Sequence, residues 1–133
     1  MGVLMLFTSN YAIAGHHPRS ISISLWAPKE FRGRCMKELA PPNSLLFDYK
    51  NKKADDIDYT RRFMAHLSTL DPHSIVASIP PLSILLCYEK PTDFCHRHIV
   101  AHWIETNTGI VVREITSKNI DEFITIAQRQ ETI

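Results

Sequence analysis

The stretch "LSILLCYEKPTDFCHRHIVAHWIETNTGIVVREI", residues 82–115, decides the fold of this chain. It opens with a continuous apolar run, which is typical of a strand covered on both faces. A helix follows, for which Thr92 or Asp93 is the expected cap, and Gly109 ends its pattern. The apolar segment 110–115 is then a second strand. Strand, helix and strand in this order predict a βαβ unit with its strands parallel.

The segments on either side extend this unit. Strands are expected at 3–9 and 21–26, and helices at 43–50, 55–70, 73–79 and 117–130. A chain of 133 residues is long enough for a hydrophobic core without disulfide or metal staples. We therefore expect residues 1–133 to form a single three-layer α/β domain, with a mostly parallel sheet of about four or more strands.

The charge of the chain gives no global reason to expect a nucleic-acid or membrane partner, because the formal net charge is +1. Residues 1–53 nevertheless carry 8 Lys and Arg against 3 Asp and Glu. The loop "PKEFRGRCMK", residues 28–37, is either a solvated basic loop or a local binding surface. Nucleic acid is therefore a weakly supported partner at this point.

The first residues and the cysteines bear on location. The apolar run from Val3 to Phe7 is too short for a signal peptide and lacks a charged segment before it, so it is interpreted as a strand. No run approaches the length of a membrane span. Three cysteines, an odd number, favour reduced thiols in a cytoplasmic protein.

The segment "CYEKPTDFCHRH", residues 87–98, is where a ligand is expected, beyond the carboxyl end of a strand and at the start of a helix. Helical geometry turns His96 toward the buried face and puts Cys95 and Arg97 on either side of it. A helix N-terminus attracts anions, and Arg97 adds a planar fork suited to an oxyanion. The same surroundings favour a lowered pKa for the Cys95 thiol.

Each of these residues also has a structural interpretation. Cys87 can be a small core residue, His96 a hydrogen-bonded core histidine, and Arg97 the ion-pair partner of Glu89 or Asp93. No metal is expected, because the spacing Cys-x7-Cys-His-x-His matches no strong zinc pattern. The sequence leaves open whether a cofactor binds and what the oligomeric state is.

The residues around this segment resemble an uncharacterised family, the domain-of-unknown-function family 488. The resemblance rests on "ILLCYEKPTDFCHRHIVAHWI", an apolar strand that ends in Cys87, then Glu89, and a Cys-His-Arg triplet at 95–97 that opens a helix. "LFTSNYA", "ISLWAPKEFRG" and "IDYTRRFMAHLSTLDP" are similar to other segments of the family. The segment "GHHPRS" and the cysteine at position 35 depart from its pattern. The resemblance implies an α/β fold and no established activity.

Two functions remain open. In the first, the protein is an enzyme that acts on a small anionic, phosphate-bearing ligand. Its catalytic residues are Cys95 as thiolate, His96 as acid and base, and Glu89 as the carboxylate that orients the histidine. The residues expected to bind the substrate are Arg97, Cys87, Thr8, Ser9, Tyr11 and Arg32, with Arg34 beside Arg32. In the second, the motif is structural and the protein is a non-catalytic module that binds a nucleotide, nucleic acid or protein.

Overall fold

Five strands form one all-parallel sheet in the part of the chain that the structure describes, residues 5–131 of a computed structural model. The strands are β1 (Met5–Asn10), β2 (Ser20–Ser22), β3 (Arg34–Cys35), β4 (Ile84–Cys87) and β5 (Val111–Glu114). The helices are α1 (Tyr11–Ala14), α2 (Asn43–Lys50), α3 (Asp56–Leu67), α4 (Pro72–Ala77), α5 (His96–Thr108) and α6 (Ile120–Glu131), with a 3₁₀ turn η1 (Lys37–Leu39). The predicted α/β fold with a parallel sheet is confirmed.

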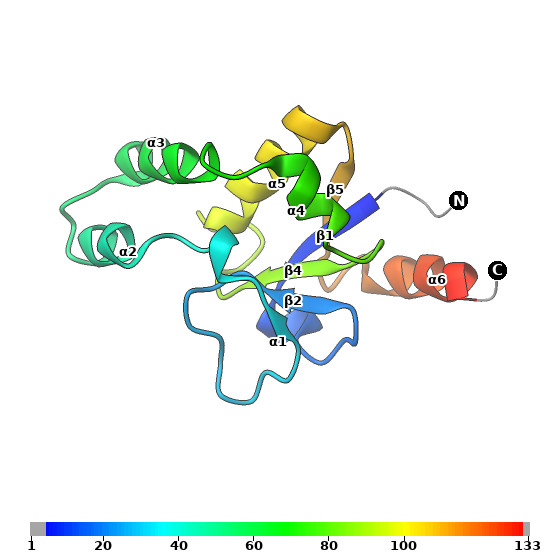
Figure 1. Cartoon of the computed structure of the whole chain (residues 1–133). Helices are drawn as coiled ribbons and strands as arrows, with labels where there is room; N and C mark the ends of the chain where they lie inside the picture. The colour runs from blue at the N-terminus through cyan, green and yellow to red at the C-terminus, as the bar shows by residue number, and fades with distance from the viewer. Residues whose placement is uncertain (1–4, 132–133) are drawn as a thin grey trace.

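Helices cover both faces of the sheet, with α3, α4 and α5 on one side and α1 and α6 on the other (Figure 1). Alternate residues of β1 divide between the two cores, since Leu6 packs with the first group of helices and Phe7 with the second. Both side chains are almost fully buried. Burial on both faces also explains why the β4 sequence is a continuous apolar run rather than an alternating one.

The strand order, β3-β2-β4-β1-β5, gathers three strand ends into one place. β4 and β5 do not pair with each other, because β1 lies between them and pairs in parallel with both. In this register Asn10 pairs with Cys87 and Thr8 pairs with Glu114. The carboxyl ends of β1, β4 and β5 therefore meet where α5 begins, as the rule for open α/β sheets requires.

The helix ends follow local rules in α3 and differ from the expectation in α5. Asp55 caps α3 in a capping box with Asp58. Helix α5 begins at His96 with Cys95 as its N-cap, and no side chain caps it. The expected caps Thr92 and Asp93 were wrong, because Asp93 takes part in a turn in which its N–H donates to the carbonyl of Lys90.

Other differences concern short or edge elements. Helix α1 and strand β3 were not predicted, because four and two residues are too few for a periodic pattern. Ile124 of α6 is exposed, at 36%. Val3 and Leu4 of the first predicted strand lie outside the described residues. No helix in residues 5–131 is both long enough and apolar enough to cross a membrane.

Candidate functional site

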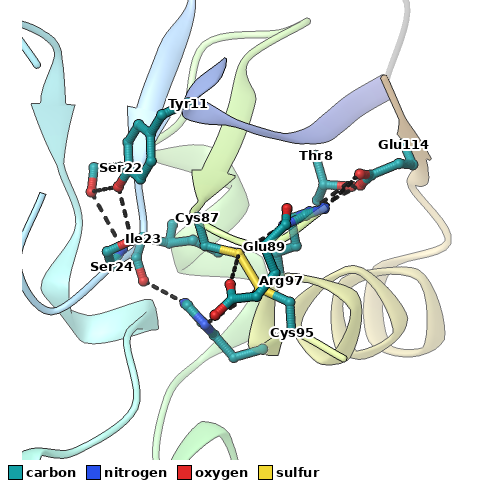
Figure 2. The surroundings of a disulfide bond; sticks show 11 residues. Thr8, Tyr11, Ser22, Ile23, Ser24, Cys87, Glu89, Cys95, Arg97 and Glu114 are labelled. Carbon is teal, nitrogen blue, oxygen red and sulfur yellow. Dashed lines mark hydrogen bonds and ion pairs between the residues drawn. A yellow bond between two sulfur atoms is a disulfide. The ribbon is translucent and has the colours of Figure 1, made fainter. Parts of the chain in front are cut away.

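The two cysteines of the motif form a disulfide, which links the end of β4 at Cys87 to the start of α5 at Cys95 (Figure 2). The expectation of three reduced thiols was therefore wrong for this pair, while Cys35 is free and exposed. Spacing did not reveal the pair, because it depends on how the chain turns back between the strand and the helix. Both cysteines are almost fully buried, with 1% and 4% exposure.

His96 points inward, as helical geometry predicts. Its Nε2 lies 2.6 Å from the carbonyl oxygen of Ile23, and its ring packs edge-on against Phe63. Burial lowers the pKa of His96 from 6.5 to about 4, so the ring is neutral near pH 7. A neutral ring that donates from Nε2 to a carbonyl presents an unprotonated Nδ1, and this atom lies 3.8 Å from the sulfur of Cys95.

Arg97 is completely buried, and its guanidinium donates hydrogen bonds to three groups. Its Nε and Nη2 donate to the carboxylate of Glu114, with Nη2 to Oε2 at 2.8 Å. Its Nη1 donates to the sulfur of Cys87 and to the carbonyl of Glu89, both at 2.9 Å. The carboxylate partner is thus Glu114 rather than Glu89 or Asp93. Because its charge is already paired, Arg97 is not free to clamp a ligand.

Thr8 and Ser9 lie behind this ion pair instead of lining a cavity. The Thr8 hydroxyl donates to Glu114 Oε1 at 2.5 Å, and the Ser9 hydroxyl donates to the carbonyl of Ile115 at 2.8 Å. Both residues are buried. Both residues lie within β1 and not in a turn after it; Thr8 holds the carboxylate partner of Arg97 in place, and neither residue lines the two cavities.

Tyr11 and the two loop arginines lie away from the sulfurs. The Tyr11 hydroxyl bonds to Ser22 and Ser24, and its ring lines a second cavity of about 210 Å³. Arg32 is exposed and lines neither cavity. Arg34 donates to the carbonyl of Ser78 at 2.7 Å. The structure therefore does not bring Arg32 or Arg34 to the motif.

Glu89 lies beside the cysteines and not beside the histidine. Its Oε2 is 3.5 Å from the sulfur of Cys87, and the residue is exposed on the wall of the larger cavity. Glu89 makes no described hydrogen bond to His96, whose orientation is set by the backbone of Ile23. The expected orienting role of Glu89 thus falls to a main-chain carbonyl.

A cavity of about 320 Å³ opens onto the disulfide. The motif residues that line it are Cys87, Glu89, Cys95 and His96. The rest of the wall was not predicted and comes mainly from aromatic side chains and a cation: Trp26, Tyr49, Lys50, Tyr59, Tyr88 and Phe94, with Ser24, Leu25, Pro41 and Leu46. This size and lining are typical of a small-molecule site.

Some of the missed residues had a signal in the sequence. Glu114 is the next-to-last residue of the predicted strand 110–115, and the carboxyl ends of neighbouring parallel strands meet at one edge. Tyr88 and Phe94 flank the motif directly. Lys50 had no such signal, because α2 lies far from the motif in the sequence and only the folding of the chain brings the two together.

The sulfurs and the histidine also form a group that could hold a metal ion. One donor atom from each of Cys87, Cys95 and His96 lies within 4.8 Å of the others. The sequence spacing did not predict this group. While the disulfide is formed, its sulfurs are not thiolates and cannot act as strong metal ligands.

Comparison with known families identifies one match. A family model described as "DUF488-N3a: Active DUF488-N3 subclade" matches residues 9–108, a segment that contains the whole Cys-Glu-Cys-His-Arg motif. No curated protein and no solved structure matches the chain.

Proposed function

Because the chain belongs to the DUF488 family, in its active DUF488-N3 subclade, we propose that it is an enzyme that acts on a small anionic ligand. The reaction takes place at the sulfur-bearing wall of the 320 Å³ cavity. The observation that carries this proposal is that the motif residues Cys87, Glu89, Cys95 and His96 all line one cavity large enough for a small molecule.

The lining supports a flat or sulfur-containing ligand with a negative group. Aromatic side chains provide apolar contact surfaces, and aromatic rings also make favourable contacts with sulfur. Lys50 is the one lysine or arginine among the lining residues, and it is exposed. Lys50 thus supplies the charge for a phosphate or carboxylate group, which Arg97 cannot supply because Glu114 already pairs with it.

The catalytic roles require the reduced form of the protein. Cys95 acts as the nucleophile, because it stands at the N-cap of α5, where the helix dipole favours a thiolate. His96 accepts its proton at Nδ1. The contact between Arg97 and the sulfur of Cys87 makes Arg97 a positioning residue for the second sulfur.

A specific observation favours a second candidate, the non-catalytic binding module. His96 and Arg97 make their hydrogen bonds within the protein, to Ile23, Glu89, Cys87 and Glu114. A structural motif needs these same contacts. In this case the cavity binds a ligand without using the sulfurs, and replacing the cysteines leaves binding unchanged.

A cytoplasmic location also remains a proposal. It rests on Cys35, an exposed free cysteine of the kind that a reducing compartment maintains. In that compartment a disulfide such as Cys87–Cys95 belongs to a catalytic or sensing cycle more often than to a permanent staple.

The first experiment measures alkylation of each cysteine in the reduced, folded protein as a function of pH, by mass spectrometry of its peptides. Exposed Cys35 serves as an internal control for an accessible thiol. We expect Cys95 to react with a midpoint below about pH 8.5, the ordinary value for cysteine, and His96→Gln to slow the reaction. If Cys95 reacts only after the protein is unfolded, the enzyme proposal is wrong and the binding module replaces it.

A further inference from the structure

The Cys87–Cys95 disulfide suggests that both cysteines take part in one reaction, an inference that rests on the function proposed above. We propose that Cys87 is a second reacting sulfur and that the site carries out thiol–disulfide exchange on a small anionic disulfide. The Cys87–Cys95 bond is then the oxidised product of the reaction. In this proposal Cys87 is a catalytic residue and not a core residue.

Both cysteines lie on the wall of the same cavity, although each is almost fully buried. Cys87 and Cys95 come from different elements, β4 and the start of α5, and both line the 320 Å³ cavity. They are already joined to each other, so one sulfur can reach a group attached to the other. A ligand bound against the aromatic wall thus meets two sulfurs that can react in succession.

The two sulfurs have different surroundings, which suits two different steps (Figure 2). Arg97 Nη1 donates to the sulfur of Cys87 at 2.9 Å, and a guanidinium that is always charged favours the thiolate. Glu89 Oε2, at 3.5 Å from the same sulfur, can accept the proton that a thiol releases. Cys95 instead has His96 Nδ1 at 3.8 Å. Each cysteine therefore has its own proton acceptor.

The exchange balances in atoms and electrons. The Cys95 thiolate attacks one sulfur of the ligand disulfide, whose S–S bond breaks, and one half of the ligand leaves as a thiolate and takes up a proton. The Cys87 thiolate then attacks the sulfur of Cys95, the Cys87–Cys95 bond forms, and the other half leaves as a thiol. One ligand disulfide is reduced to two thiols while two protein thiols are oxidised. A dithiol reductant restores the protein by the reverse exchange.

The cavity limits the substrate to small molecules. A volume of about 320 Å³ holds a ligand of low molecular weight and not a folded protein surface. Lys50 favours a disulfide that carries carboxylate or phosphate groups, and the rings of Tyr49, Tyr59 and Phe94 favour contact with its sulfur atoms.

The experiment uses the full chain with Cys35→Ser, so that the exposed thiol does not react. The reduced protein is mixed with oxidised glutathione, an anionic disulfide, and followed by intact mass spectrometry. We expect the unaltered pair to release two glutathione molecules per protein and to form the Cys87–Cys95 disulfide. Cys87→Ser should stop after the first step and keep one glutathionyl group on Cys95. Cys95→Ser should lose this adduct.

Two further variants test the contacts. Lys50→Gln should raise the glutathione disulfide concentration needed for half-maximal rate, whereas Lys37→Gln, an exposed lysine outside the cavity lining, should leave it unchanged. Arg97→Lys keeps the charge without the planar fork and should slow the second step more than the first. Circular dichroism confirms that each variant is folded.

Several outcomes overturn the proposal. Equal adduct formation in Cys87→Ser and Cys95→Ser removes the separate roles of the two sulfurs. Adduct formation without closure of the Cys87–Cys95 bond removes Cys87 from the reaction but leaves the enzyme proposal intact. If Cys95 alkylates readily in the folded protein and no glutathione adduct forms in any variant, disulfide substrates are excluded, and only the inference of this subsection fails.

Discussion

The buried ion pair between Arg97 and Glu114 gives the sharpest prediction about stability. Arg97→Met removes the guanidinium and keeps most of the side-chain volume. Breaking a buried ion pair by removing one partner typically costs about 3–5 kcal/mol. The Glu114 side chain is 21% exposed, so water can reach the carboxylate that is left behind. The lower end of that range, about 3 kcal/mol, is therefore expected.

The assays are urea unfolding, which gives the free energy of unfolding, and thermal unfolding, which gives Tm, both at pH 7 with the disulfide intact in every variant. For a chain of this length, a loss of about 3 kcal/mol lowers Tm by roughly 10 °C. The matched control is Arg62→Met, since Arg62 pairs with Asp48 at the same N–O distance, 2.8 Å, but with both side chains about a third exposed. That pair should contribute less than about 1 kcal/mol.

The double variant Arg97→Met with Glu114→Leu separates two causes of the lost stability, the unpaired charge and the altered packing. Replacing both partners by apolar residues should restore much of the stability, because no unpaired buried charge remains. If Arg97→Met lowers the stability no more than Arg62→Met does, burial adds nothing to the Arg97–Glu114 pair.

Three other predictions follow from the structure. Burial lowers the pKa of His96 to about 4, so between pH 6.5 and 4 the folded protein binds fewer protons than the unfolded chain. About 3 kcal/mol of stability that is present above pH 6.5 is therefore lost as the pH falls toward 4. Urea unfolding at several pH values in this range should show the loss, and His96→Asn should make the stability less dependent on pH. Gly109 has a positive φ of 74° at the end of α5 and open space where a Cβ would lie. Gly109→Ala should therefore lower the stability by about 1 kcal/mol through backbone strain alone, and Gly109→Asn should lower it less. Equal Tm values for the two variants would contradict backbone strain as the cause. Zinc should protect Cys87 and Cys95 from alkylation in the reduced protein, because the two thiolates and His96 Nδ1 then supply three ligands. If the protection persists in His96→Gln, the histidine is not a ligand.

Local pattern predicted most of the fold. The helix at 43–50 agrees with α2 at both ends, and the N-cap of α3 is Asp55, one of two neighbouring aspartates whose residue type suits that position. The interpretation of segment 82–115 gave two parallel strands and a helix that ends at Gly109. These elements have clear periods or cap residues within a few positions, and such signals do not depend on the rest of the chain.

Prediction failed where the pattern was short or ambiguous. Thr92 and Asp93 are good cap residues by type, but they lie in the turn before α5, and Cys95 takes the N-cap position without a side-chain bond. Helix α5 thus starts at a residue that cap preferences do not indicate. At this start Cys95 is linked to Cys87 and His96 is buried.

Most of the helices and strands, the parallel sheet and the segment that carries the motif follow from the sequence alone, because these depend on neighbouring residues and on general rules of chain connection. The groups that the motif contacts follow only from the way the chain folds. The Ile23 carbonyl meets His96 across 73 positions, and Thr8 meets Glu114 across 106. Such contacts are set by strand order and by the packing of helices over the sheet, and no local pattern records them. The same long-range packing turned Arg97 from an expected ligand clamp into a buried partner of Glu114 and Cys87.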